Sequence, residues 1–564
     1  MKKLILILTV LIMSGLAFAQ NNLPFSKGVN LFDFFTTWNQ SDKLPDMYRY
    51  DEADFICMKS MGIDVIRLAI CFDYQMEPEY TGKIKEAVLQ KLDEVCDWAE
   101  KYQIYLIIDN HSLGSEERWD KIKPKDVEEH LQSVWSQVAP RYKDRSDYII
   151  YEIQNEPGFR TGTDWNKIQQ KMIDLIRKYD TKHSIIVSHQ NYGQVADLTK
   201  FKPYKDPNLI YSFHFYEPML FVHQGEGRAD FAEGAFGKMK GIPFPYDREK
   251  MPSVPSGIPD YDWYKYLYEQ YSQEGTEKHI KSLIKKAADW GKKYNVRLFC
   301  GEIGAGVTID VTSRAAWNKA VTGALKEYNI PYCVWGLDYA CGFLDFSSTG
   351  IEEPGRIFPD DISKDIVESY GFSMPDADAV SKTSMTLFPQ KPYIVYDGIV
   401  GKHADFFRFG EIESVNEDDS HGYCIKGKYS GQSGAIFVPP KKIISSFVKD
   451  NVSLCISVSV KFTDKNQRLG VHLCDTDEGA GLPPWQNSYI VKASDYKTGD
   501  WVTVEIPVSK FKESGAWSDK VSRWFDPQGK FDWSRFERIF IEVKSENDLM
   551  KGDIYIDDIV IKKK

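Results

Sequence analysis

Two glutamates, Glu156 and Glu302, stand where two strand-like runs of the chain end. Glu156 lies in the tripeptide Asn155-Glu156-Pro157, directly after the apolar run at residues 148–154, and Glu302 directly follows a second such run at residues 296–301. Two carboxylates at the ends of buried strands can break a glycosidic bond, because one protonates the leaving oxygen while the other attacks or shields the positively charged sugar. An Asn-Glu-Pro tripeptide alone is a weak signal, because any exposed Glu before a Pro would give the same pattern. Whether the two glutamates form a catalytic pair depends on the elements around them.

Short apolar runs alternate with amphipathic helical stretches from about residue 24 to residue 371. The eight expected strands lie at residues 28–31, 65–69, 105–109, 148–154, 184–188, 210–215, 297–300 and 332–335. Eight buried strands that alternate with helices predict an α/β fold, the (β/α)8 TIM barrel. An open doubly wound sheet is the alternative, but no Gly-x-Gly-x-x-Gly follows an early strand. Residues 217–275 are expected to form a long, elaborated loop after the sixth strand, on the face where barrels carry their sites.

The carboxyl ends of barrel strands converge on one site, so the residues at those ends belong together. In chain order they are Arg67, Asn110, His111, Asn155, Glu156, His214, Tyr216, Glu302 and Trp335. In type, order and spacing, this set resembles the family 5 glycoside hydrolases, the cellulase family, over most of residues 28–371. Taken singly, each residue has an ordinary structural explanation, such as an ion pair for Arg67 or core packing for Trp335. Together they favour a catalytic interpretation.

The resemblance implies a role for each member of the catalytic group. Glu156 would be the acid/base and Glu302 the nucleophile of a retaining reaction. Tyr216 would hydrogen-bond Glu302 and keep it ionised and oriented toward the sugar. Arg67 would stabilise the same carboxylate through its positive charge. Asn155 would contact the sugar 2-hydroxyl through a bond that strengthens in the transition state.

The resemblance also implies a −1 sugar subsite. His111 and His214 would line this subsite, and Trp335 would be its stacking floor. Candidate platforms for sugars beyond −1 follow the first strand: Phe34, Phe35 and Trp38. Packing of the barrel rim is an equally good interpretation of those three rings.

Composition excludes several classes of function. The net charge of −11 argues against a nucleic-acid partner, whose phosphates call for a basic surface. The aromatic content of 14% is high, and surplus flat rings suit the faces of sugars. Nine cysteines cannot all pair within the chain, and no Cys-x-x-Cys or other metal-ligand spacing is present. We therefore assign no disulfide and expect no metal at the catalytic site.

The first nineteen residues have the pattern of a secretory signal. Lys2-Lys3 is the charged start, residues 4–13 are apolar, and Ala17-Phe18-Ala19 is a small-x-small cleavage site. The mature protein is therefore expected to be exported to the periplasm or beyond, from a bacterial source. No later stretch is long and apolar enough to cross a bilayer, so no membrane insertion is expected.

The pattern changes beyond the expected barrel domain, residues 20–373. Residues 374–392 are rich in Pro, Ser, Thr and Asp and are expected to form a linker or a lead-in strand. Short alternating runs fill residues 393–564 and predict an all-β sandwich. This part resembles a jelly-roll carbohydrate-binding module in its closing run, residues 552–561, and in its tryptophans, Trp485, Trp501, Trp517, Trp524 and Trp533.

The jelly-roll resemblance has a further implication. In many such modules an acid on the last strand helps to hold a structural calcium, which here implies Asp557 or Asp558. Solvated surface acids are the alternative interpretation of those two residues. For the whole domain, the alternative is a scaffold that only packs on the barrel.

The sequence thus predicts an exported, monomeric, retaining hydrolase that acts within a β-1,4-linked polysaccharide of the β-glucan class. An endo-β-1,4-glucanase that needs no cofactor for catalysis is the preferred activity. A β-mannanase or a xyloglucanase would use the same two glutamates, and a transglycosylase would differ only in its acceptor. A non-catalytic glycan-binding protein is the alternative from another class, but a pure binder has no need for two converging carboxylates.

Overall fold

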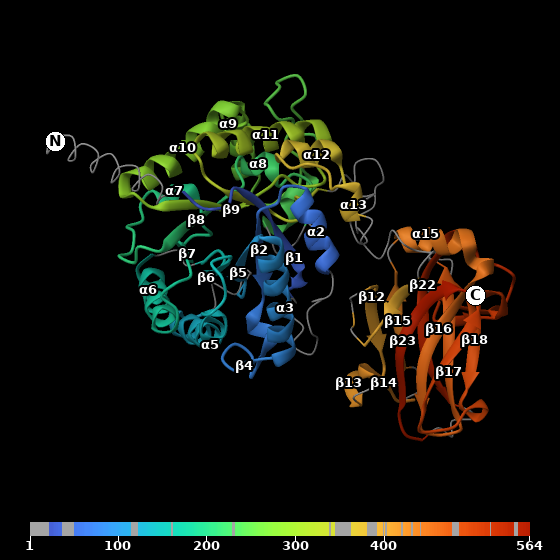
Figure 1. The fold of residues 1–564 in the computed structure, drawn as a ribbon. Helices are drawn as coiled ribbons and strands as arrows, with labels where there is room; N and C mark the ends of the chain where they lie inside the picture. Colours follow the sequence, from blue (N-terminus) through green and yellow to red (C-terminus); the bar gives the residue numbers. More distant parts are fainter. Residues whose placement is uncertain are drawn as a thin grey trace, which may run out of the picture. The chain divides into compact units, whose positions relative to one another are not determined.

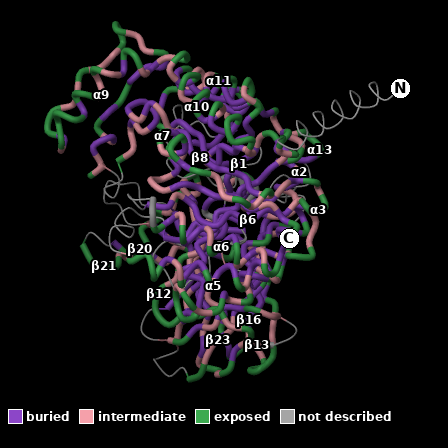
Figure 2. The backbone as a smooth tube through the Cα atoms, turned by 90° about the vertical axis from the view of Figure 1, so that its left-hand side faces the viewer, coloured by how far each residue is buried: buried purple, intermediate pink, exposed green. Residues whose placement is uncertain are grey.

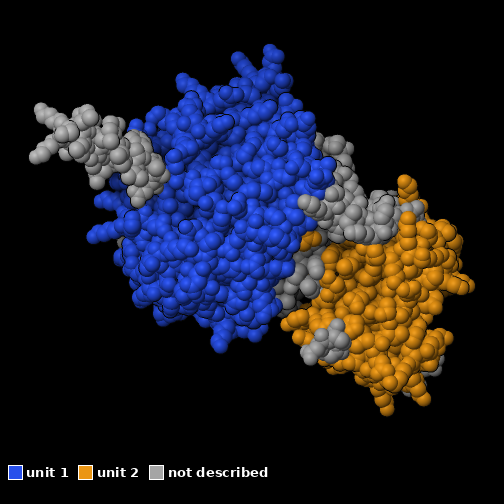
Figure 3. Space-filling model, in the orientation of Figure 1, with its two compact units in different colours: residues 1–45, 52–379 blue, residues 46–51, 380–564 orange. Residues whose placement is uncertain are grey.

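The chain is described from a computed structural model, which divides it into two compact units. The described residues are 22–36, 50–113, 122–158, 162–227, 232–337, 340–343, 362–380, 392–398, 400, 403–418, 421–429, 433–439, 441–475, 484–518, 521–545 and 551–564. Unit 1 is Met1–Pro45 with Glu52–Ala379, and unit 2 is Asp46–Asp51 with Val380–Lys564 (Figure 3).

Unit 1 is built on a closed barrel of eight parallel strands, in the order β1-β10-β9-β8-β7-β6-β5-β2 (Figure 1). The strands are β1 (Lys27–Phe35), β2 (Val65–Ile70), β5 (Tyr105–Asn110), β6 (Ile149–Glu152), β7 (Ile185–Ser188), β8 (Leu209–Phe215), β9 (Arg297–Ile303) and β10 (Tyr332–Val334). The predicted TIM barrel is confirmed, and each strand coincides with an apolar run of the sequence. The closing strands, β1 and β10, pair in parallel through Lys27–Tyr332, Gly28–Cys333 and Val29–Val334.

Helices follow the strands and cover the outside of the barrel (Figure 1). They include α2 (Glu52–Ser60), α3 (Glu86–Tyr102), α5 (Pro124–Tyr142), α6 (Gly162–Tyr179), α7 (Val195–Leu198), α10 (Glu277–Tyr294), α11 (Val311–Glu327), α12 (Lys364–Ser369) and α13 (Ala377–Val380). Helix α10 shows why such segments are helical. Its Thr276 N-cap accepts a hydrogen bond from the His279 amide. Its buried residues, Ile280, Ile284, Ala287 and Trp290, recur at helical spacing and so form one apolar face.

The side chains inside the barrel form layers. At the amino ends of the strands an apolar floor is built from Phe25, Val65, Ile107, Ile150, Ile186, Ile210, Phe299 and Cys333. Alternate residues of a strand point to the same face, so the residues two positions further along also point inward. On β2, β5 and β6 these residues are Arg67, Asp109 and Glu152, all buried. The layer above the apolar floor is therefore charged.

The segment between β8 and α10 is the expected long, elaborated connection after the sixth barrel strand. It contains α8 (Met219–Val222), the short 3-10 helix η2 (Ala232–Lys238) and α9 (Tyr261–Glu274). Buried residues such as Phe221 and Tyr271 give these short helices apolar faces of their own. Among the described residues, no helix has the length and apolar character needed to span a membrane.

Unit 2 consists of two antiparallel sheets. One has the order β13-β14-β23-β16-β19, with β11 paired to β23, and the other has the order β12-β15-β22-β17-β18-β20-β21. The strands are β11 (Tyr393–Tyr396), β12 (Asp405–Phe409), β13 (Ile412–Asp418), β14 (Gly422–Gly427), β15 (Ser433–Val438), β16 (Leu454–Phe462), β17 (Gln467–Asp475), β18 (Trp485–Lys492), β19 (Trp501–Pro507), β20 (Lys512–Ser518), β21 (Arg523–Phe525), β22 (Phe536–Ser545) and β23 (Ile554–Lys563). Residues of both sheets, with those of α15 (Lys441–Asp450), share one apolar core. The predicted β-sandwich is thus confirmed.

Candidate active site

The barrel brings together, at the carboxyl ends of its strands, the eight residues to which the resemblance gives a role in catalysis or in the −1 subsite. They are Arg67 on β2, His111 after β5, Asn155 and Glu156 after β6, His214 on β8, Tyr216 after β8, Glu302 on β9 and Trp335 after β10. Trp38, a candidate platform for sugars beyond −1, lies outside the described residues.

Arg67 is the cation at the centre of this group, and its side chain has no exposed surface. Its Nη1 lies 2.8 Å from Glu302 Oε1. On the other side, Nε and Nη2 donate to the two oxygens of Glu152, at 2.7 and 3.0 Å. Nη2 also lies 3.1 Å from Asp109 Oδ2. One guanidinium therefore faces three carboxylates, one of which is the predicted nucleophile.

Burial and charge act against each other in this cluster. Burial disfavours the charged guanidinium, but the carboxylates of Asp109, Glu152 and Glu302 outweigh it and raise the pKa of Arg67. Burial raises the pKa of Asp109 to about 7, although Arg67 opposes the shift. The pKa of Glu152 is raised for the same reason. Arg67 is therefore permanently charged, whereas Asp109 and Glu152 take up a proton more readily than exposed carboxylates do.

Glu302 is held from two sides. Besides the contact with Arg67, its Oε2 accepts a hydrogen bond of 2.8 Å from the Tyr216 hydroxyl. Burial, with the negative charge of Glu302, raises the pKa of Tyr216 well above its ordinary value, so this hydroxyl keeps its proton and donates it. Together, the two contacts fix the orientation of the Glu302 carboxylate.

His214 links the two glutamates. Its Nδ1 lies 2.7 Å from Glu156 Oε1 and 3.4 Å from Glu302 Oε2. These three ligand atoms all lie within 4.8 Å of one another. Burial lowers the pKa of His214 to about 4, so the ring is neutral near pH 7 and adds no charge between the carboxylates. The side chain of Glu156 is 30% exposed, whereas that of Glu302 is 5% exposed, so the two glutamates have different environments.

His111 and Asn155 form a hydrogen-bonded chain across the site. Arg67 Nη2 donates to Asn155 Oδ1 at 2.9 Å, which leaves the Asn155 amide to donate to His111 Nε2 at 3.1 Å. His111 Nδ1 must then carry the ring proton and donate it to Asp109 Oδ2, at 2.7 Å. Burial lowers the pKa of His111 to about 4, consistent with a neutral ring. The tautomer of His111 is thus set by its neighbours.

Trp335 forms one wall of the site. Its ring stacks on His111, with centroids 5.3 Å apart and planes 13° apart, and also contacts Phe32 at 5.1 Å. Trp335 remains partly exposed. The platform interpretation of Phe34 and Phe35 was wrong, because both are fully buried and pack against each other at 4.8 Å. They belong to the packing of the barrel rim.

Three residues of the site escaped the sequence analysis: Asn30, Asp109 and Glu152. Asn30 accepts from Arg67 Nη1 at 2.9 Å and donates to the carbonyls of Gly301 and Val334. In the sequence, Asp109 and Glu152 each lie inside an otherwise apolar strand. The available signal was their spacing, since each lies two residues after an apolar floor residue and so points into the barrel.

Two groups of described residues have the spacing to ligate a metal ion: Glu156 with His214 and Glu302, and His421 with Asp557 and Asp558. In the first group, Arg67 and Tyr216 already occupy both oxygens of Glu302, and His214 contacts Glu156. This first group is therefore better suited to proton transfer and nucleophilic attack than to a metal. The second group lies in unit 2.

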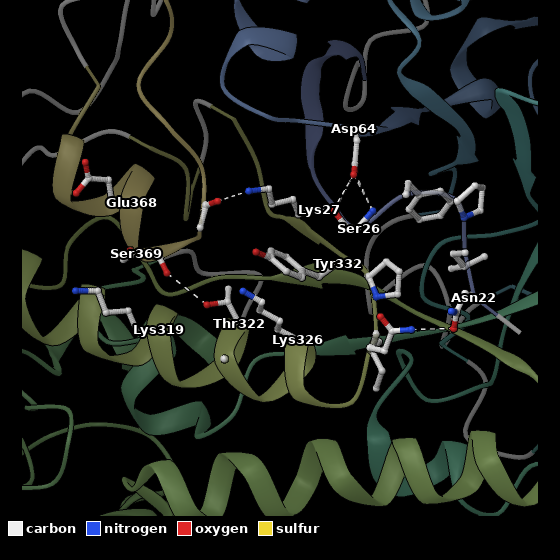
Figure 4. A pocket seen from close by; sticks show the side chains of 18 residues that line it. Asn22, Ser26, Lys27, Asp64, Lys319, Thr322, Lys326, Tyr332, Glu368 and Ser369 are labelled. Carbon is white, nitrogen blue, oxygen red and sulfur yellow. Dashed lines mark hydrogen bonds between the residues drawn. The ribbon is translucent and has the colours of Figure 1, made fainter. Parts of the chain in front are cut away.

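A pocket of unit 1 lies at the opposite end of the barrel. It is lined by residues that precede or begin the strands, among them Ser26, Lys27, Asp64 and Tyr332 (Figure 4). Ser26 donates to Asp64, and Lys27 Nζ donates to the Gly371 carbonyl. The polar groups of this pocket thus hold the amino-terminal segment to the barrel, and the pocket contains none of the predicted catalytic residues.

Comparison with known proteins agrees with this geometry. Residues 24–340 match the family described as cellulase (glycosyl hydrolase family 5). The chain is 25% identical to Endoglucanase C of Acetivibrio thermocellus over 321 residues, which cover 56% of this chain and 91% of that protein. It is 29% identical to Endoglucanase 3 of Fibrobacter succinogenes over 332 residues, 55% of this chain and 49% of that one.

A solved endoglucanase structure shares the fold. It has a TM-score of 0.50 and 23% sequence identity, and the match covers 63% of this chain and 99% of that one. The family match spans the whole barrel, from the segment before β1 to the residues after β10. The chain therefore belongs to glycosyl hydrolase family 5, and it is a glycoside hydrolase.

Proposed function

We propose that this protein is a retaining endo-β-1,4-glucanase in which Glu156 is the acid/base and Glu302 the nucleophile. The observation that carries the mechanism is the approach of these two carboxylates, which have oxygens within 4.8 Å of each other. Retaining glycosidases hold their carboxyl groups about 5–5.5 Å apart, whereas inverting enzymes need about 6.5–9.5 Å to admit a water. The activity on β-1,4-glucan is supported by the relatives, which are named endoglucanases.

In the first step, a lone pair of Glu302 attacks the anomeric carbon while the bond to the leaving oxygen breaks. Glu156 donates its proton to that oxygen, and a covalent glycosyl ester forms on Glu302. Arg67 and Tyr216 fix the attacking carboxylate through Oε1 and Oε2. The neutral ring of His214 contacts Glu156 without supplying a permanent positive charge that would draw its proton away.

In the second step, Glu156 takes a proton from a water molecule, which attacks the anomeric carbon and releases Glu302. Two inversions at one carbon retain the β configuration of the substrate. Asn155, held by Arg67, has a second amide hydrogen to donate to the −1 sugar. The ring of His111, fixed by Asp109, lines the subsite, and Trp335 supplies an apolar face beneath the sugar. No step of this mechanism requires a cofactor.

We predict that the wild-type protein releases reducing sugar from carboxymethyl cellulose faster than from xyloglucan, glucomannan or xylan. Glu302→Gln should lower kcat by roughly three orders of magnitude or more, because a neutral amide cannot form the glycosyl ester. Glu94→Gln, at an exposed position on α3, is the matched control and should keep wild-type activity. A reducing-sugar assay over the four polysaccharides provides the measurement.

Two results would contradict this proposal. Full activity of the Glu302→Gln protein would remove Glu302 from the mechanism. A clear preference of the wild type for glucomannan or xylan would leave the mechanism standing but replace the proposed substrate.

We also propose that unit 2 binds glycan chains, with Trp517 and Trp524 as its platform. These two residues are direct cross-strand partners on β20 and β21, and each is 41% exposed. The other tryptophans of this unit are less available. Trp485 is buried, Trp533 packs on the core, and Trp501 stacks on His421 at 4.0 Å. Of the five tryptophans, this pair has the exposure and the shared face that a sugar platform needs.

This platform makes a testable prediction. In the Glu302→Gln background, which removes hydrolysis, the full chain should be retarded in a gel that contains soluble β-glucan. Adding Trp517→Ala and Trp524→Ala should reduce this retardation to the level that the barrel alone produces. Adding Tyr423→Ala, which removes a 49% exposed ring from the other sheet, should leave it in place. Equal retardation of all three proteins would favour the scaffold interpretation.

A cation beside Asp557 is the third part of the proposal. Asp557 is 2% exposed, and its Oδ1 has no hydrogen-bond partner, so this oxygen is free for a metal ion. His421 Nδ1 lies 3.0 Å from the other oxygen of Asp557 and 3.6 Å from Asp558. The carboxylates fit the expected calcium, whereas an imidazole donor fits zinc better. Among the described residues of unit 2, this group is the candidate structural metal centre.

We predict that removing a bound divalent ion with a chelator lowers the thermal midpoint of unit 2, measured by calorimetry on the full chain. Restoring calcium or zinc separately should identify the ion, because only the correct one restores the midpoint. Asp557→Asn should show the low midpoint with or without chelator. If the wild-type midpoint does not change with chelator, no structural ion is present.

We also propose that the protein is exported from the cell. This proposal rests only on the sequence of residues 1–19, which lie outside the described residues.

A further inference from the structure

Exposed aromatic side chains of unit 1 gather on one helix, α9, in the segment that follows β8. Among the described residues of this unit, the exposed large hydrophobic side chains are Tyr179, Tyr261, Trp263, Tyr266 and Tyr294. Three of the five lie within six residues at the start of α9, with exposed fractions of 45% for Tyr261, 44% for Trp263 and 55% for Tyr266. Figure 2 shows α9 as a largely exposed helix at the edge of the unit. Exposed rings this dense need a physical reason.

The helix divides its aromatic residues between two faces. Tyr264 and Tyr271 are buried and hold α9 to the rest of the segment. Tyr271 donates to the Pro243 carbonyl at 2.7 Å. Trp263 and Tyr266 are three positions apart, so their side chains are neighbours on the outer surface. They form a pair of adjacent rings with solvent on the outer side.

This ring pair is connected to the catalytic site by a series of ring contacts. Trp263 contacts Tyr264 at 4.8 Å, and Tyr264 contacts Phe236 at 5.4 Å. Phe236 contacts His223 at 5.6 Å, and His223 contacts Tyr216 at 5.9 Å. Tyr216 is the residue that donates to Glu302. Four ring contacts thus link Trp263 with Tyr216 in the catalytic site.

The position of α9 also favours the catalytic face. The segment leaves the carboxyl end of β8, where His214 and Tyr216 lie, and returns through α10 to the amino end of β9. By contrast, the exposed Tyr179 and Tyr294 are the last residues of α6 and α10. The carboxyl ends of these helices lead into the amino ends of strands, so these two tyrosines lie at the opposite end of the barrel.

We propose that Trp263 and Tyr266 form a distal subsite that holds the polysaccharide chain several sugars away from the bond that is cleaved. The inference rests on the proposed β-glucanase function. A sugar ring presents apolar C–H groups on its face, and stacking them on an aromatic ring removes that surface from water. A linear glucan is the occupant that can reach both α9 and the catalytic carboxylates at once. A protein partner or a second copy of the chain would have no need for that continuity.

The test compares two double variants of the full chain. Trp263→Ala with Tyr266→Ala removes the proposed subsite, whereas Tyr179→Ala with Tyr294→Ala removes two similarly exposed rings at the other end of the barrel. Each protein is assayed on carboxymethyl cellulose and on an aryl β-cellobioside, which is too short to reach α9. Circular dichroism checks that both variants are folded.

The subsite variant should lose about tenfold in kcat/KM on the polysaccharide relative to its change on the aryl cellobioside, mainly through KM. The control variant should show the same ratio of the two activities as the wild type. An unaltered ratio in the subsite variant, or an equal fall on both substrates, would overturn the inference. If the wild type cleaves the aryl cellobioside but not the polysaccharide, the proposed endo-glucanase function fails, and the inference fails with it.

Discussion

The buried guanidinium of Arg67 is the constraint on which the rest of the site depends. A charge with no contact with solvent is stable only when paired, and removing one partner of a buried ion pair costs about 3–5 kcal/mol. The guanidinium of Arg67 contacts side chains on or directly after four other strands, β1, β5, β6 and β9. These side chains are Asn30, Asp109, Glu152, Asn155 and Glu302. The same contacts that neutralise the cation fix the register of these strands and aim Glu302. Stability and catalytic geometry are therefore coupled through one residue.

The charge balance around Arg67 also explains why three carboxylates surround one cation. Burial raises the pKa of Asp109 and of Glu152, so these two groups bind a proton more readily than an exposed carboxylate does. Asp109 in turn orients His111, which links it to the sugar-binding edge of the site. The charged layer thus supports the catalytic layer above it.

Much of this arrangement could be predicted from the sequence, for a physical reason. Parallel strands that are buried on both faces are continuous apolar runs, so all eight could be located, and their carboxyl ends had to converge. That reasoning found Glu156, Glu302 and their immediate contacts. It missed Asp109 and Glu152 because a single charged residue inside an apolar run has no visible partner until the strands are paired. It also overestimated Phe34 and Phe35, since composition alone does not tell a buried ring from an exposed one.

The central claim is that Glu156 and Glu302 lie close enough for a double displacement with retention. The most direct measurement is time-resolved proton NMR of the sugar first released from an aryl β-cellobioside, before mutarotation. The separation of the two carboxylates predicts that the β anomer of cellobiose appears first and that the α anomer grows in later. If the α anomer appears first, the enzyme inverts, and the assignment of Glu302 as a nucleophile is wrong.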